Sequence, residues 1–378
     1  MTPDRVRYRD LGLTVGLLAP GPLNAITDVA GVSVGMTTLI EGEGPLVVGG
    51  GPIRTGVTVV VPHPDITDSP VFAGCHRLNG NGELTGLEWI RESGQLTTPI
   101  AITNTHSVGV VRDALVAADV AGHGRSSSAF WSLPVVGETY DGTLNDINGF
   151  HVRPEHLHSA LGGAVGGPVP EGNVGGGTGM ICHEFKGGTG TASRINGAWT
   201  VGALVQANHG RRERLTVDGV PVGRELGTDK APSAWDQEDQ VFAAGSGSII
   251  VILATDAPLL PHQCERLAQR AALGIARVGG GGEHSSGDLI LAFANGNAGR
   301  FRSYKMEAAT DPLEVRMVPE GSMTELFWSA IEATEEAILN ALIAAETMTG
   351  RDSITAHALD HDMLVDVMSR YGRGPSTT

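Results

Sequence analysis

A serine placed directly after a glycine, at the start of a long apolar run, is the residue of this sequence best suited to nucleophilic chemistry. Gly247-Ser248 precedes the apolar run at 249–254, whose β-branched residues predict a buried strand. Glycine leaves the carbonyl of its peptide bond unshielded because it has no Cβ. The Ser248 hydroxyl is therefore able to attack that carbonyl, and the pattern favours a chain that cleaves itself between Gly247 and Ser248.

After such a cleavage Ser248 would be a new N-terminus that carries both a hydroxyl and an α-amine. An α-amine has a pKa of about 7.7–8, so it is able to serve as the base that activates the hydroxyl. Gly245-Ser246 offers a second Gly-Ser bond just upstream, and Gly-Ser pairs are also common in linkers. Ser248 is preferred because the strand that it begins would hold its side chain rigidly.

Three polar residues at the ends of other apolar runs could support this nucleophile. Asn208 ends a predicted strand at 199–208, and an amide donor at such a place is able to stabilise an oxyanion by about 2.7–4 kcal/mol. Ser286 and Asp288 precede the apolar run at 289–294 and share one face. They could polarise Ser248 if the two strand beginnings are neighbours. Otherwise Asn208 caps a turn, and Ser286 and Asp288 belong to a polar turn.

Glu138 and Tyr140 lie two residues apart in a predicted short strand at 133–142. Side chains at this spacing share one face of a strand, so the two residues could line a pocket together. The alternative is simple turn chemistry, since Asp141-Gly142 follows at once.

The composition excludes several classes of protein. The chain has 378 residues and a formal net charge of −16, without a cluster of Lys and Arg, so neither nucleic acid nor a membrane surface is an expected partner. Arg211–Arg214 is interpreted as a solvated loop. No signal peptide or transmembrane segment is predicted. The three cysteines, Cys75, Cys182 and Cys264, are far apart and without metal-ligand spacing, which suits the reducing cytoplasm.

The elements that must position these residues are strands joined by glycine-rich turns and followed by helices. Helices are predicted from 108 to 120, from Pro261, and from a capping box at Ser322 to about 346, while residues 211–247 have the composition of a flexible linker. The glycine loops at 172–180 and 187–191 lack the Gly-Lys-Ser/Thr ending of a phosphate-binding loop. His357 and His361 have a metal-compatible spacing, but a surface helix is the preferred interpretation.

Five separated motifs together resemble the L-aminopeptidase/D-amidase-D-esterase (DmpA) family, which includes the β-peptidyl aminopeptidases. They are found at 78–86, 136–142, 206–208, 247–259 and 285–288, and the resemblance runs from about 26 to 371. It implies an α+β fold, a four-layer αββα sandwich similar to N-terminal-nucleophile hydrolases but with different connectivity. It also implies a single peptidase domain, 1–378, that cleaves itself into an α chain, 1–247, and a β chain, 248–378.

The resemblance also implies roles for the candidate residues. Ser248 matches the nucleophile, Ser286 and Asp288 match its supporting pair, and Asn208 matches the residue that stabilises the oxyanion. Glu138 matches the carboxylate that holds the free amine of the substrate, with Tyr140 beside it. Some relatives carry glutamate where Asp288 stands, and this shorter side chain could alter positioning.

The expected protein is thus an aminopeptidase or amidase that acts on small peptides, amides or esters through an acyl-enzyme. Members of the family assemble as oligomers of the cleaved pair and need no metal, so no cofactor is expected. Two alternatives remain open. One is an uncleaved homologue that binds a small amine-bearing ligand without turnover, and the other is a biosynthetic enzyme on the same scaffold. Self-cleaving ornithine acetyltransferases expose a threonine, whereas serine follows Gly247 here.

Overall fold

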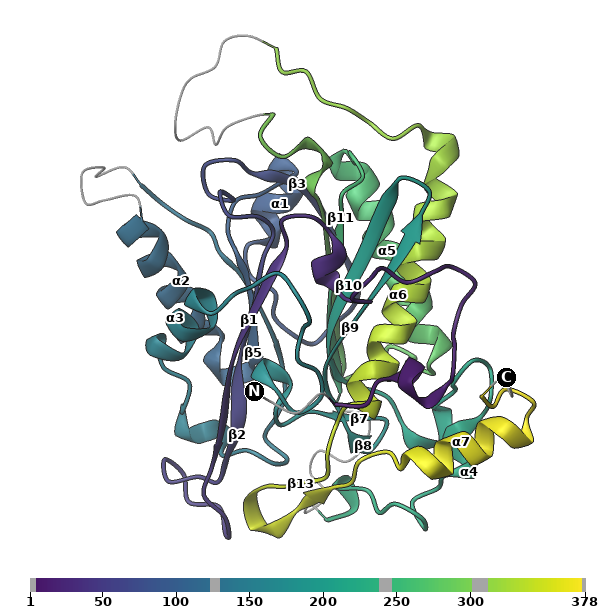
Figure 1. Ribbon diagram of the computed structural model, residues 1–378. Coiled ribbons are helices and arrows are strands. Elements are labelled where there is room, and N and C mark those ends of the chain that lie inside the picture. The colour runs from purple at the N-terminus through teal and green to yellow at the C-terminus, as the bar shows by residue number, and fades with distance from the viewer. Residues whose placement is uncertain (1–4, 123–129, 238–246, 301–311, 376–378) are drawn as a thin grey trace.

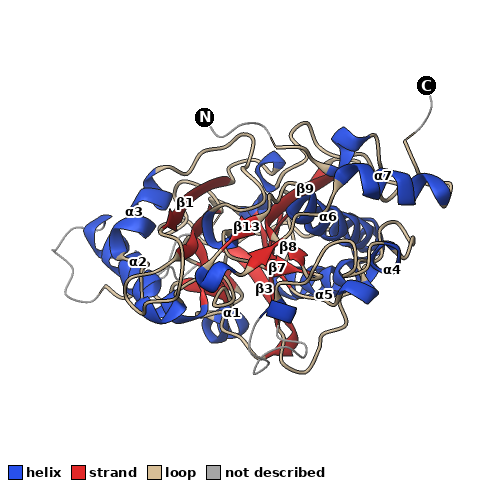
Figure 2. Ribbon diagram, turned by 90° about the horizontal axis from the view of Figure 1, so that it is seen from below, coloured by secondary structure: helices blue, strands red, loops and turns tan. Residues whose placement is uncertain are grey.

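Two β-sheets packed face to face form the centre of the protein, as a computed structural model shows for residues 5–122, 130–237, 247–300 and 312–375. The smaller sheet has the strand order β1-β2-β5-β6, and the larger sheet has the order β4-β3-β12-β11-β10-β9. Helices cover the outer face of each sheet (Figures 1 and 2). The result is a four-layer αββα sandwich, which confirms the predicted fold class.

The bounds of the elements are as follows. The smaller sheet contains β1 (Ser33–Glu41), β2 (Ile53–Val61), β5 (Ile100–Asn104) and β6 (Val135–Thr139), and the larger contains β3 (Val71–Gly80), β4 (Gln95–Leu96), β9 (Gly188–Asn196), β10 (Trp199–Asn208), β11 (Ser248–Thr255) and β12 (Gly287–Ala294). Two small ribbons pair β7 (Ile181–Cys182) with β8 (Phe185–Lys186) and β13 (Met348–Thr349) with β14 (Thr355–Ala356). The helices are α1 (Leu87–Ser93), α2 (Val108–Gly122), α3 (Pro154–Gly162), α4 (Val222–Glu225), α5 (Pro261–Arg277), α6 (Met323–Ile343) and α7 (His361–Arg370).

Strand β11 shows why the layers form. Successive side chains of a strand point to opposite faces, and β11 is apolar on both. Ile250 and Ile252 enter the core between the two sheets, whereas Val251 and Leu253 enter the core beneath α5 and α6. A strand that is buried on both faces reads as a continuous apolar run, which is the pattern that predicted it.

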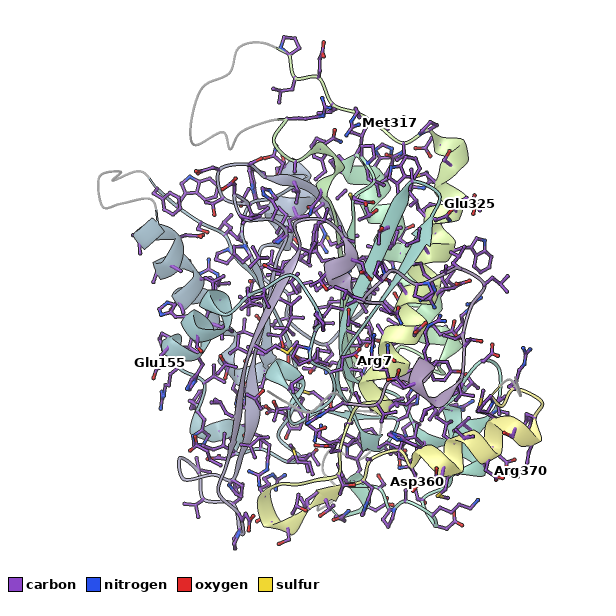
Figure 3. The ribbon with its side chains drawn as sticks, viewed as in Figure 1. Arg7, Glu155, Met317, Glu325, Asp360 and Arg370 are labelled. Carbon is purple, nitrogen blue, oxygen red and sulfur yellow. The ribbon has the colours of Figure 1, made fainter. Side chains whose placement is uncertain are left out.

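The outer layers are amphipathic helices. Helices α2 and α3 pack on the smaller sheet through residues such as Val111, Leu115 and Leu157, and α5 and α6 pack on the larger one. Figure 3 marks the two outer layers with Glu155 on α3 and Glu325 on α6, and side chains fill the space between them. No described helix is long and apolar enough to cross a membrane.

The predicted linker is wrong for most of its length. Residues 215–226 contribute to the core beneath the larger sheet, where Leu215, Val217 and Val222 are completely buried. Ala234 and Trp235 pack in a smaller cluster with Met348 and Ala356. Arg212, expected in a solvated loop, is only 3% exposed. Its guanidinium lies over the ring of Phe185, and its nitrogens donate to backbone carbonyls, including that of His183. A buried arginine whose nitrogens are paired in this way stabilises the fold, because it joins this segment to the β7–β8 turn.

Two smaller predictions also fail. Ser322 does not cap α6 with its side chain, because a 3₁₀ turn over Glu320–Ser322 precedes the helix and gives Ser322 helical backbone angles. His357 and His361 do not share a helix, since α7 begins at His361. The ring of His361 instead contacts the carbonyl of Ile343 at 2.9 Å.

Candidate active site

Three strand ends meet at Ser248 in the middle of the larger sheet. Ser248 begins β11, pairs across the antiparallel side with Asn208 at the end of β10, and pairs across the parallel side with Gly287 at the start of β12. The beginnings of β11 and β12 are therefore neighbours, which was the condition for a functional interpretation of Ser286 and Asp288. The side chain of Ser248 is largely buried, and its Oγ accepts a hydrogen bond of 3.1 Å from the backbone N–H of Gly287.

Ser286 and Asp288 form a buried pair beside this serine. The Ser286 hydroxyl donates a hydrogen bond of 2.6 Å to Oδ1 of Asp288. Burial raises the pKa of Asp288 to about 6, although the bonds from Ser286 and from the backbone of Ile249 oppose the shift. Because the hydroxyl proton of Ser286 is directed at Asp288, the lone pairs of its Oγ remain able to accept a hydrogen bond from another group.

Asn208 has a fixed amide orientation. Its Oδ1 accepts a hydrogen bond of 2.8 Å from the backbone N–H of Ile181. A backbone N–H is only a donor, so the amide end that faces it must be the oxygen. The NH₂ group of Asn208 is therefore directed away from Ile181, and this end of the side chain is available as a hydrogen-bond donor beside the start of β11.

Glu138 comes from β6, in the opposite sheet. It is 3% exposed, its Oε1 accepts a 2.9 Å hydrogen bond from the backbone N–H of Glu83, and its Oε2 accepts one from the Thr105 hydroxyl. Burial raises the pKa of this carboxyl, and the hydrogen bonds from Thr105 and Glu83 oppose the shift. A carboxylate held in this way is suited to bind an ammonium group, which donates charge-assisted hydrogen bonds to it.

A close approach of backbone brings Glu138 to the start of β12. A Cβ placed at Gly82 would lie 3.1 Å from Oε1 of Glu138 and 3.1 Å from the Cα of Gly287. The Asn81 backbone N–H also donates to the carbonyl of Ser286 at 3.1 Å. The Asn-Gly segment that the sequence placed at a loop rim thus joins the carboxylate of one sheet to the serine site of the other.

Tyr140 directly follows β6 and is half-buried. Its hydroxyl folds over Gly142, where a Cβ would lie only 2.3 Å from it. Asp141, its neighbour, is completely buried, and burial raises its pKa to about 6. The amide of Asn145 donates a 3.1 Å hydrogen bond to it. Asp141 is therefore a buried structural residue of this turn.

Sequence reasoning missed the groups that hold these side chains. Thr105, Ile181 and the backbone of Glu83 fix Glu138 and Asn208, and no local pattern marks them. Lys186 was also missed. It is completely buried, its Nζ donates to the carbonyls of Met180 and Gly187, and burial holds its pKa well below the usual value.

The four-layer sandwich with a serine at the head of a central strand is the arrangement of a hydrolase related to the N-terminal-nucleophile enzymes. A family model described as Peptidase family S58 matches residues 24–356, and the chain belongs to that family. The predicted resemblance is thereby confirmed.

Individual relatives agree with this assignment. The chain is 49% identical to a β-peptidyl aminopeptidase, BapA, from Sphingosinicella microcystinivorans, over 97% of this chain and 93% of the relative. Among solved structures it is similar to a β-aminopeptidase from Burkholderia sp., with 54% identity, a TM-score of 0.88, and coverage of 97% of this chain and 99% of that one. The L-aminopeptidase D-Ala-esterase/amidase from Ochrobactrum anthropi, described as a variant of the Ntn hydrolase fold, gives 46% identity and a TM-score of 0.87 with the same coverage. The chain is thus a hydrolase with aminopeptidase or amidase function, as predicted.

Proposed function

We propose that this protein releases N-terminal residues from small peptides, amides or esters, with Ser248 as the nucleophile. The observation that carries the proposal is the junction of three strand ends at Ser248, where an amide and a serine–aspartate pair lie next to one central serine. A rigid strand end positions a nucleophile better than a loop does. Each of these neighbouring groups has one role in the proposed reaction.

The first step of the proposal is self-cleavage of one domain, 1–378, into chains 1–247 and 248–378. Oγ of Ser248 attacks the carbonyl carbon of Gly247 and loses its proton, the peptide C–N bond breaks, and the nitrogen takes up a proton to become the free α-amine of Ser248. Water then hydrolyses the resulting ester and releases the carboxylate of Gly247. The N–H of Gly287, which donates to Oγ of Ser248, favours the attack because it stabilises negative charge on that oxygen.

Hydrolysis of substrate then repeats the same chemistry. Oγ of Ser248 attacks the substrate carbonyl, its proton passes to the α-amine or the Ser286–Asp288 pair, and the leaving amine departs protonated. The NH₂ of Asn208 stabilises the oxyanion, and water hydrolyses the acyl-enzyme. Asn208 suits this task because Ile181 already holds its oxygen, so no reorganisation is needed when the charge develops.

The free amine of the substrate pairs with Glu138, and Tyr140 lines the pocket. An ammonium group donates charge-assisted hydrogen bonds to a carboxylate, and such recognition restricts cleavage to the first residue of a peptide. The relatives described as β-peptidyl aminopeptidases and β-aminopeptidase support β-amino acids as the preferred first residue.

We also propose a homo-oligomer of cleaved pairs that works in the cytoplasm. All three cysteines are free and buried, which fits a compartment that keeps thiols reduced. Sedimentation of the purified protein measures the assembly directly.

Intact mass spectrometry of the wild type and of Ser248→Ala tests the proposed chemistry. Two wild-type fragments, the smaller beginning at Ser248, and one full-length variant are expected, and only the wild type should hydrolyse β-alanyl and alanyl p-nitroanilides. A matched Ser246→Ala variant should cleave normally. Ser246 lies outside the described residues, so this variant also decides which of the two Gly-Ser bonds is cut. A wild-type chain that stays intact and inactive would favour the ligand-binding homologue.

A further inference from the structure

A cysteine and two histidines lie together behind the strand end that carries Asn208. Cys182 ends β7, His183 is the next residue in the turn to β8, and His209 follows the last residue of β10. Figure 1 labels the three strands. Sγ of Cys182 is 3.8 Å from Nδ1 of His209, and one potential ligand atom from each of the three residues lies within 4.8 Å of the others. All three side chains are at most 1% exposed.

Each of the two imidazoles has one buried nitrogen without a hydrogen-bond partner among the described residues. Nδ1 of His183 is 3.0 Å from the carbonyl of Arg211. A carbonyl only accepts, so this nitrogen carries the proton and Nε2 is a bare acceptor. Among the described residues, Nε2 of His183 is buried without a hydrogen-bond partner, as is Nε2 of His209. An imidazole binds one ion through one nitrogen, so His183 would use its bare Nε2 and His209 the Nδ1 that faces Cys182. Such unpaired groups are rare in folded proteins and call for a physical explanation.

The surroundings have the features of a metal site. Histidines that bind metals almost always donate their second ring N–H to a carbonyl or carboxylate, as His183 does. Two glycines leave room for the rings: a Cβ at Gly210 would lie 2.3 Å from Cε1 of His183, and a Cβ at Gly280 would lie 3.0 Å from Cδ2 of His209. The backbone N–H of His183 also donates to the carbonyl of His209 at 2.7 Å, which fixes the two residues relative to each other.

We propose that Cys182, His183 and His209 bind one thiophilic metal ion, Zn²⁺ or Cu⁺. Thiolate and imidazole ligands favour these ions over Mg²⁺ and Ca²⁺. A tetrahedral ion with bonds of about 2.3 Å to sulfur and about 2.0–2.1 Å to nitrogen separates those ligands by roughly 3.6 Å. The 3.8 Å between Sγ of Cys182 and Nδ1 of His209 is close to this value, and the unpartnered Nε2 of His183 would be the third ligand atom. On binding, the Sγ–H bond of Cys182 breaks, its proton goes to solvent, and an S–metal bond forms.

The two candidate ions would give the site different net charges. With one thiolate and two neutral imidazoles, Cu⁺ gives a site of zero net charge, whereas Zn²⁺ leaves one positive charge. The buried guanidinium of Arg212 donates to the carbonyl of His183 at 3.0 Å, and Glu184 accepts from the backbone N–H of Arg212 at 3.1 Å. Because the two ions differ in the charge that they bring to this buried site, their binding is measured separately.

The ion would act on the active site through the backbone. Ile181, which holds the oxygen of Asn208, directly precedes Cys182, and Asn208 directly precedes His209. Gly247 lies against the same backbone, since a Cβ there would be 2.8 Å from the Cα of His209. A bound ion would tie the β7–β8 turn to the end of β10, so the three ligands are positioning residues rather than catalytic ones.

Titration of chelator-treated, reduced protein with Co²⁺, Zn²⁺ and Cu⁺ tests the site. We expect one equivalent of ion to bind, a thiolate-to-cobalt absorption band in the near ultraviolet that Zn²⁺ or Cu⁺ abolishes, and a higher thermal midpoint with metal. His183→Asn keeps a residue suited to the positive φ of 48° at this turn but removes a ligand. Cys182→Ser removes the thiolate. Both variants should lose the band, and the buried Cys264→Ser should keep it.

Absence of the band in wild type, together with no stoichiometric binding of Zn²⁺ or Cu⁺, would overturn the proposal. Equal binding by wild type and both ligand variants would overturn it as well. Binding of either ion alone supports it and identifies the ion. The wild-type result decides the question even if Cys182→Ser does not fold. Ser248→Ala should bind metal like the wild type, so the outcome is independent of the proposed nucleophile.

Discussion

At the scale of single residues, burial controls the proton chemistry of this site. The pKa of Asp288 is raised to about 6, and Asp288 accepts the Ser286 hydrogen bond fully only as a carboxylate. The logarithm of kcat/KM should therefore increase as the pH rises from 5 to 7, with an inflection near 6, because deprotonation supplies the proton acceptor. Initial rates on β-alanyl p-nitroanilide across this range measure it.

Asp288→Asn supplies the contrast, since its amide does not titrate. Its residual activity should lose the inflection near pH 6, whereas Ser285→Ala, one residue outside the pair, should keep it. An unchanged inflection in Asp288→Asn would assign the titration to another group, and Glu138, whose pKa is also raised, would be the first to examine.

Glu138 should contribute mainly through the substrate's ammonium group. Hydrogen bonds to charged groups contribute about 1.5–3 kcal/mol, so Glu138→Gln should lower kcat/KM for aminoacyl p-nitroanilides roughly 10- to 150-fold. An ester substrate whose amine is replaced by hydrogen should be cleaved equally by variant and wild type. Glu83→Gln is the matched control, because its backbone N–H still donates to Glu138, while the variant removes a neighbouring carboxylate that raises the pKa of Glu138. Equal losses on both substrates would contradict the assignment.

The sequence predicted which polar side chains gather at Ser248 better than it predicted what holds them. Ser286, Asp288 and Asn208 stand at strand ends, where period-two patterns end and a polar residue is conspicuous. The partners of Asn208 and Glu138 lie far away in sequence, at Ile181 and Thr105. Contacts between such distant residues depend on how the sheets pack, which no local pattern encodes.

At the scale of elements, the approach to β11 requires glycine at the bond before it. A Cβ at Gly247 would lie 2.8 Å from the carbonyl oxygen of Asn208, and overpacking of this kind costs about 1–3 kcal/mol. Gly247→Ala should therefore slow self-cleavage at least several-fold, as a time course of intact masses would measure. Gly109→Ala in α2, where a Cβ meets no atom within 4 Å, should cleave at the wild-type rate. Equal rates would show that the strand end adapts.

The elements themselves were predictable where an apolar pattern continues through the whole element. The buried run of β11 and the helix α2 appear as expected, because repeated apolar positions override local ambiguity. Residues 212–237 were mistaken for a linker because their apolar residues are separated by polar ones and by turns. Leu215 and Val222 are nonetheless fully buried. Short irregular segments of this kind gain their order from the hydrophobic clusters that they join.

At the scale of the whole molecule, the cut at 247 would not separate the two fragments. In the larger sheet the strand order β4-β3-β12-β11-β10-β9 places β11 and β12, the two strands that the C-terminal fragment contributes to this sheet, between strands of the N-terminal fragment. Backbone ladders and two cores thus join the fragments on both sides. A single species in native sedimentation and two bands under denaturing conditions are expected, and two native species would contradict this arrangement.

Buried ion pairs add a second connection between the fragments. Arg194 of β9 is completely buried and contacts Glu332 at 3.2 Å and Glu336 at 2.7 Å, both on α6. Arg9 also binds Glu336 at 2.7 Å. Removing one partner of a buried pair costs about 3–5 kcal/mol, because the other charge stays buried. Arg194→Met should therefore lower the free energy of unfolding of the cleaved pair by roughly 3 kcal/mol, with Arg9 compensating part of the loss.

Urea unfolding at a fixed protein concentration measures this effect, since two fragments unfold in a concentration-dependent way. Arg370→Met removes a surface arginine that pairs with Glu225 and Asp366, and it should leave the midpoint unchanged because exposed pairs contribute little. If Arg194→Met unfolds at the wild-type midpoint, the strand order alone holds the fragments together. A midpoint that falls only in Arg194→Met would instead show that the buried charges on α6 keep the fragments together after the chain is cut.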